Sequence, residues 1–165
     1  MSSVWSHLGL GFVLAFSLVF SDAHAHSYTR GSIEIHHPYA QTTRPGMRNG
    51  AVYFLSIQNK GETPDRLLSA QSSVAERVEL HRMSMDGQIM RMREVESIGL
   101  LPNEKLSFRH GQSNNYHIML LNLKASLKEG DRFLVSLRFE NAGEIEITVH
   151  VQNLKENVTE HHHGK

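Results

Sequence analysis

The stretch that decides the fold is Arg132-Phe-Leu-Val-Ser-Leu-Arg-Phe139, followed after a short gap by Glu144-Ile-Glu-Ile-Thr-Val-His-Val-Gln152. In both segments apolar side chains recur at every second position, which places them on one face of an extended strand. The gap between them contains Asn141-Ala-Gly143, whose residue types are typical of a turn. The pattern therefore predicts two neighbouring strands, each with one buried and one polar face.

Upstream of this pair, the sequence is a series of short strand-like segments broken by turn residues. No segment has a long apolar stripe of helical period. Many short strands at a spacing of about ten residues are typical of an antiparallel sandwich or barrel, so we expect an all-β fold with a loop over residues 38–49. The further predicted strands are Ser32–His36, Ala51–Gln58, Arg66–Ala70, Arg77–Met83, Gln88–Glu94, Lys105–Arg109 and Tyr116–Asn122.

Composition excludes several classes of function. The chain has 165 residues and a formal net charge of zero, which predicts one domain and gives no reason to expect binding to nucleic acid or to an anionic membrane. It has no cysteine, so disulfides, cysteine nucleophiles and thiolate metal sites, including blue-copper sites, are excluded. No catalytic triad or phosphate-binding glycine loop stands out. We therefore expect a protein that is not an enzyme.

Both ends of the chain differ from its centre. Leu8–Phe20 is a continuous apolar run, too short for a membrane span, and Ala23-His-Ala25 after it fits a small-x-small cleavage site. We expect residues 1–25 to be a cleaved signal peptide and the mature chain to lie in the periplasm without a membrane span. Residues 26–152 would form the domain, and residues 153–165 a flexible, histidine-rich tail.

Methionine and histidine concentrate between residues 81 and 119, where five of the seven methionines lie. Asp86-Gly87 predicts a hairpin that brings the segment before it against the segment after it. Thioether and imidazole without thiolate form a ligand set that suits a soft ion of low charge, and Cu(I) is the main candidate. The pairs His81/Met83, Met90/Met92 and His117/Met119 are each two residues apart, so in a strand each pair shares a face.

Packing in the core does not explain these positions. Leu80 and Ile118 take the apolar face of their predicted strands. His81 and His117 then point to the opposite face, together with the methionines two residues further on. A binding role explains methionines on that face better than core filling does.

At this point the sequence resembles a known family. Residues 36–139 are similar to the periplasmic copper chaperones called PCuAC, whose pattern is His, ten residues, Met, about twenty-one residues, then His-x-Met. Here ten residues separate His81 from Met92, and His117-Ile-Met119 supplies the last element. Twenty-four residues separate Met92 from His117, three more than the pattern, and we place the excess in the polar segment 109–115. The flanking matches are Ala75–His81, Met90–Glu96, Tyr116–Leu120 and Leu127–Asp131.

The resemblance implies a single-domain Greek-key sandwich of cupredoxin-like or immunoglobulin-like type. It implies that His81, Met92, His117 and Met119 bind copper as Cu(I). It further implies a carrier that delivers copper to the copper centres of cytochrome oxidase, with an oxidase subunit or another copper chaperone as its protein partner.

Other histidines and methionines are accessory candidates. Met83, Met85 and Met90 lie close to the implied ligands in the sequence and are candidates for accessory contacts with the metal. His161, His162 and His163 form an imidazole cluster in the tail, which suits uptake of Cu(II). His110 lies in the segment with the excess residues. It is either an additional metal ligand or a solvent-exposed side chain without a role in binding.

Two other functions stay open at this stage. One is a copper storage or resistance buffer without a defined acceptor. The other is a copper oxygenase that uses His26, at the expected mature N-terminus, in a histidine brace. The oxygenase reading assigns no role to the methionines.

Overall fold

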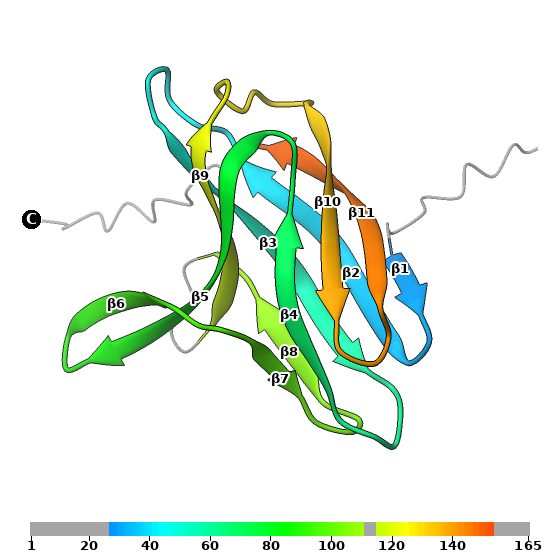
Figure 1. Ribbon diagram of the computed structural model, residues 1–165. Helices are drawn as coiled ribbons and strands as arrows, with labels where there is room; N and C mark the ends of the chain where they lie inside the picture. The colour runs from blue at the N-terminus through cyan, green and yellow to red at the C-terminus, as the bar shows by residue number, and fades with distance from the viewer. Residues whose placement is uncertain (1–26, 111–114, 154–165) are drawn as a thin grey trace, which may run out of the picture.

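The computed structural model describes residues 27–110 and 115–153, and this part of the chain consists of strands and the turns between them (Figure 1). None of these residues forms a helix long and apolar enough to cross a membrane. The all-β, single-domain prediction is confirmed. The strands are β1 (Ser27–Arg30), β2 (Ile33–Gln41), β3 (Asn49–Asn59), β4 (Asp65–Gln71), β5 (Ala75–Asp86), β6 (Ile89–Glu94), β7 (Ile98–Leu100), β8 (Lys105–Phe108), β9 (Tyr116–Leu123), β10 (Arg132–Phe139) and β11 (Glu144–Gln152).

The strands form one sheet in the order β6-β5-β9-β3-β2-β11-β10-β4-β7, with β1 paired to β2 and β8 paired to β3. Strands β4 and β5 lie near opposite ends of this order yet contact each other, so the sheet curls around one core. One pairing departs from the antiparallel expectation, because β11 runs parallel to β2. Parallel neighbours need a long connection, and here the rest of the domain provides it.

The alternation that predicted β10 and β11 is present in the structure. Phe133, Val135 and Leu137 of β10 are buried, and the residues between them are exposed or half-buried. Ile145 and Ile147 of β11 repeat the pattern and pack in the same core. The two strands pair in register around the turn at residues 140–143, as the sequence indicates.

Some strand limits differ from the prediction. β2 continues to Gln41 instead of ending at His36, so the connection to β3 is shorter than the expected loop over residues 38–49. β1 and β7 were not predicted. β1 is mostly exposed and has no apolar alternation, and β7 has three residues, too few for a periodic signal.

The β5–β6 hairpin is the feature that positions the site, and it extends away from the body of the sheet (Figure 1). Asp86 pairs with Ile89, so the two turn residues are Gly87 and Gln88, one residue later than expected. Gly87 has a φ of 62°, a conformation that glycine adopts at little cost. β5 also pairs with β9 on its other side, which places β5 between a strand of the body and the edge strand β6.

A buried carboxylate joins the β10–β11 turn to the start of β4. Asp65 accepts hydrogen bonds from the backbone N–H groups of Asn141 and Ala142, both at 2.9 Å, and from Arg66 at 2.7 Å. We expect Asp65→Asn to lower the free energy of unfolding by about 1–2 kcal/mol, because the amide nitrogen cannot accept these bonds. Urea denaturation measures this. Asp86→Asn, at an exposed ion pair with Arg91, is the matched control and should change stability by less than about 0.5 kcal/mol. An equal effect of both variants would contradict a stabilising role for the hydrogen bonds of Asp65.

Candidate metal centre

Strand register brings together the residues that the sequence predicted as ligands. His81 of β5 lies opposite His117 of β9, and Met83 lies opposite Met92 of β6. Met119 lies two residues beyond His117 on the same strand. Because alternate residues of a strand share a face, all of these side chains lie on one face of the three-stranded segment β6-β5-β9. The opposite face of β5 and β9 packs in the core through Leu80 and Ile118, as expected.

The two histidines form a cross-strand pair. Their ring centroids are 5.5 Å apart, with the planes at 61°. His117 is 2% exposed, and the His81 side chain is 15% exposed. The Nδ1 atoms of both rings are buried and have no hydrogen-bond partner among the described residues. Buried ring nitrogens are normally satisfied, so these two point to a ligand that the rings are built to bind.

Glu79 fixes the orientation of His81. Its Oε2 atom lies 2.8 Å from Nε2 of His81. If Nε2 carries the proton, it donates to the carboxylate, and the lone pair of the neutral ring is then on Nδ1. A carboxylate behind a histidine is the usual support of a metal-binding imidazole. The arrangement therefore prepares the unpartnered Nδ1 of His81 for a metal ion.

The environment of His117 keeps its ring neutral. Burial, together with repulsion between positive charges on His117 and on the nearby His81 and His110, lowers the pKa of His117 from 6.5 to about 4. A neutral imidazole is the form that binds metals. His117 is therefore ready to bind without losing a proton at neutral pH.

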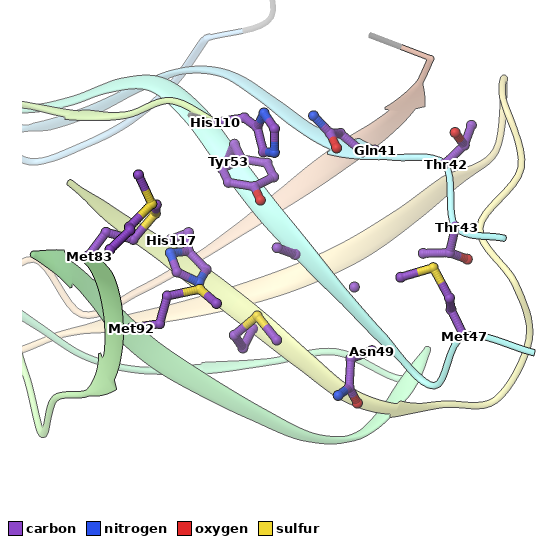
Figure 2. A pocket seen from close by; sticks show the side chains of 14 residues that line it. Gln41, Thr42, Thr43, Met47, Asn49, Tyr53, Met83, Met92, His110 and His117 are labelled. Atoms are coloured by element: carbon purple, nitrogen blue, oxygen red, sulfur yellow. The ribbon is translucent and has the colours of Figure 1, made fainter. Parts of the chain in front are cut away.

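A cavity of about 510 Å³ opens beside the histidine pair (Figure 2). Figure 2 shows Met83, Met92 and His117 gathered at one end of it, with Thr43 and Met47 at the other. Its lining residues are Gln41, Thr42, Thr43, Met47, Asn49, Gly50, Ala51, Tyr53, Met83, Met90, Met92, His110, His117 and Met119. Three of the four predicted ligands thus line one cavity, and the fourth, His81, is not part of the lining but contacts the ring of His117.

The accessory candidates differ in whether they line the cavity. Met83 is buried and lines the cavity, and Met90 lines it from the exposed strand β6. Met85 is exposed and is not part of the lining. The tail histidines His161–His163, the expected signal peptide and His26 lie outside the described residues.

Some residues of this region were missed or undecided from the sequence. The ring of Tyr53 contacts the rings of both His110 and His117, at centroid distances of 5.3 Å and 6.0 Å. His110 is exposed and borders the cavity, so both roles considered for it from the sequence stay open. Glu79 had a usable signal, because it lies two residues before His81 and shares its face. Tyr53 and Met47 had none, since β3 and the loop before it reach the cavity only through tertiary pairing.

The donor set is soft rather than hard. No group of three or more His, Cys, Asp or Glu side chains in the described part of the chain is placed to hold a metal ion. The cavity is instead lined by the imidazoles of His110 and His117, with His81 against His117, and by the thioethers of Met47, Met83, Met90, Met92 and Met119. Thioethers favour Cu(I) over Zn²⁺ and over the hard divalent ions. The residues present therefore fit Cu(I).

Comparison with protein families gives one match. The model of the family described as lipoprotein LpqE-like matches residues 33–151, which include every strand from β2 to β10 and almost all of β11. No curated protein matches the chain.

Solved structures give matches over most of the chain. The apo PCuAC domain from PmoF1 is 25% identical and has a TM-score of 0.66, with 78% of this chain and 100% of that chain covered. The copper-bound PCuAC domain from PmoF2 is 25% identical with a TM-score of 0.65, covering 78% of this chain and 99% of that one. The Cu(I) form of DR1885 from Deinococcus radiodurans, at 22% identity and a TM-score of 0.53 over 79% and 83% of the two chains, shows the fold alone.

Proposed function

The chain belongs to the LpqE-like family, and we propose that it is a copper-binding chaperone that holds one Cu(I) ion between His81, Met92, His117 and Met119. The observation that carries the proposal is the pair of buried Nδ1 atoms, without a hydrogen-bond partner among the described residues, next to a cavity lined by thioethers. The solved PCuAC domain from PmoF2 is described as copper-bound, and it covers most of this chain at 25% identity. Two imidazoles and two thioethers complete a four-coordinate site.

Charge also favours Cu(I) at this site. Four neutral ligands leave one net positive charge on the bound ion. The Glu79 carboxylate, on the same face of β5 as His81, is hydrogen-bonded to His81 and also paired with Arg77 at 2.7 Å, so it offsets part of that charge. A divalent ion would leave two positive charges against the same carboxylate, so the site discriminates by charge as well as by softness.

A carrier must release its cargo, and the position of Met92 suits release. Met92 lies on the edge strand β6 and is 59% exposed, whereas His117 is buried in the body of the sheet. An acceptor can therefore approach the ion from the side of Met92 and replace the exposed thioether first. We propose the copper centres of cytochrome oxidase, or another copper chaperone, as the acceptor.

The remaining parts of the proposal concern the ends of the chain. We propose that residues 1–25 direct export to the periplasm and are removed, and that residues 26–152 form the copper-binding domain. His161–His163 in the tail are proposed to take up Cu(II) before it is reduced. Copper titration under reducing and under oxidising conditions, with these three histidines replaced by alanine in the comparison protein, tests the tail separately from the centre.

Transfer is the measurement that separates a chaperone from a storage buffer. The copper-loaded protein is mixed with a purified oxidase subunit, and the metal on each protein is measured over time. Rapid transfer supports the chaperone. Retention of copper, with exchange only to small chelators, would instead favour a buffer. A histidine brace at His26 predicts copper-dependent oxidation of a substrate that is lost when an extra residue precedes His26.

Glu79 provides a test of the geometry around the ion. We expect Glu79→Gln to weaken Cu(I) binding by about 10-fold or more, because the amide neither orients His81 as firmly nor offsets the charge of the ion. Competition with a chromogenic Cu(I) chelator measures the affinity. Glu76→Gln is the matched control, since Glu76 is an exposed carboxylate on the same strand, and it should leave the affinity unchanged. Equal affinities for the Glu79 variant and the parent protein would contradict this role.

A further inference from the structure

The β5–β6 hairpin carries two methionine pairs on the face that leads to the histidines. Met83 lies opposite Met92, and Met85 lies opposite Met90. The four positions alternate with Arg82, Ser84, Arg91 and Arg93, which belong to the other face of the hairpin. Successive pairs are two residues apart, or about 7 Å along the strands. The four thioethers therefore form a ladder from the tip of the hairpin to the proposed centre.

Core packing does not account for this ladder. Met85 is 43% exposed and Met90 is 46% exposed, so neither side chain buries much apolar surface. Neither belongs to the hydrophobic core cluster. Exposed positions of an edge strand usually carry polar or charged residues, which protect the edge from pairing with another chain. Two opposite methionines at such positions point to a role for sulfur itself.

The ladder is continuous with the cavity. Met90 lines the same cavity as Met92, His117 and Met119, although it lies one pair nearer the tip than Met92 does. Methionine has three rotatable bonds, so thioethers on opposite strands converge on a shared ion without a change in the backbone. An ion bound near the tip is therefore one ligand exchange away from the proposed centre.

Charge on this face is compatible with a cation. Arg82, Arg91 and Arg93 belong to the opposite face, and Arg91 pairs with Asp86 at 2.8 Å. The next residue of β6 on the methionine face after Met92 is the exposed Glu94, which lies opposite His81. A cation on the ladder thus approaches a carboxylate, and the one arginine of β5 on this face, Arg77, is paired with Glu79 at 2.7 Å.

From this arrangement we infer that Met83, Met85 and Met90 form a second Cu(I) site at the hairpin, made of thioethers alone, through which copper enters or leaves the histidine centre. The inference rests on the proposed function of that centre. Without imidazole the second site binds more weakly than the first, which is what an entry site requires. Copper moves between the two sites by exchanging its thioether ligands, and Met92 serves as a ligand at both positions. Copper stays in the Cu(I) state with its single charge.

Methyl NMR of the full chain, with ¹³C-labelled methionine methyl groups, tests the inference. Ag(I) is added in chloride-free buffer as a redox-stable substitute for Cu(I). We expect the first equivalent to shift the methyl signals of Met92 and Met119. A later, weaker binding step should then shift Met85 and Met90. Because the readout follows single methionines, binding at the tail histidines does not disturb it.

Two variants make the result specific. Met85→Leu with Met90→Leu keeps the size and apolar character of both side chains and should abolish the second step while the first remains. Ile89→Leu is the matched control, because Ile89 is a 60% exposed apolar residue of the same hairpin that carries no sulfur and does not line the cavity, and it should keep both steps. The inference is overturned if no second step shifts the hairpin methyl groups, or if the double variant retains that step. Absence of the first step would instead overturn the histidine centre itself.

Discussion

Replacing His117 by alanine is expected to lower the affinity for Cu(I) by at least about 100-fold, because it removes a ligand and not only a supporting group. His117 is the most buried of the four proposed ligands and projects from β9, which is paired on both sides. The cavity lining holds one other imidazole, that of His110, which contacts Tyr53 at a ring-centroid distance of 5.3 Å. Competition between the protein and a Cu(I) chelator of known affinity measures the loss.

A matched histidine substitution shows whether the effect is specific. His37 is an exposed histidine of β2 outside the cavity, and its φ of 47° is one that asparagine tolerates. His37→Asn should therefore leave Cu(I) affinity unchanged. Circular dichroism of both variants checks that each is folded. If the folded His117→Ala protein binds Cu(I) as tightly as the parent protein does, the proposed ligand set is wrong.

The same histidine should make the metal-free protein sensitive to acid, with an effect of about 3 kcal/mol. The pKa of His117 is about 4 in the folded protein and about 6.5 in an unfolded chain. Between these values the unfolded chain binds the proton and the folded protein does not. Protonation therefore favours unfolding, so the free energy of unfolding is highest above pH 6.5 and falls as the pH is lowered to 4.

Urea denaturation of the metal-free protein at several pH values between 7.5 and 4 measures this dependence. His117→Gln removes the titrating group and should flatten the curve in that range, whatever its effect on stability at neutral pH. His37→Asn should keep the slope of the parent protein. A curve of equal steepness for the parent and His117→Gln would show that another group causes the loss.

Much of the fold could be predicted because the decisive segments are regular. β10 and β11 have one apolar face each, and a period of two residues is sufficient to assign both strand and orientation. The parallel pairing of β2 with β11 could not be predicted, since it joins segments a hundred residues apart and depends on how the sheet curls. β1 lacked any signal because its residues are mostly exposed.

The proposed ligands could be selected because each pair shares a face within one short segment. Alternation alone placed His81 opposite to the core side chain of Leu80, and the structure has the same arrangement. The wall formed by Tyr53 and Met47 could not be predicted, because those residues reach the cavity from strands and loops far away in the sequence. The depressed pKa of His117 likewise results from tertiary burial, which no local pattern encodes.

The parallel pairing also has a geometric consequence at the C-terminal end of the domain. Gln152, the last residue of β11, is in register with Gln41, and Gln41 is part of the cavity lining. The point at which the tail is attached to the domain is therefore in register with a residue of the cavity lining. His161 is eight residues beyond Asn153, a contour of at most about 28 Å. On such a short tether, a metal ion held by the tail would be presented to this end of the domain at an effective concentration on the order of millimolar.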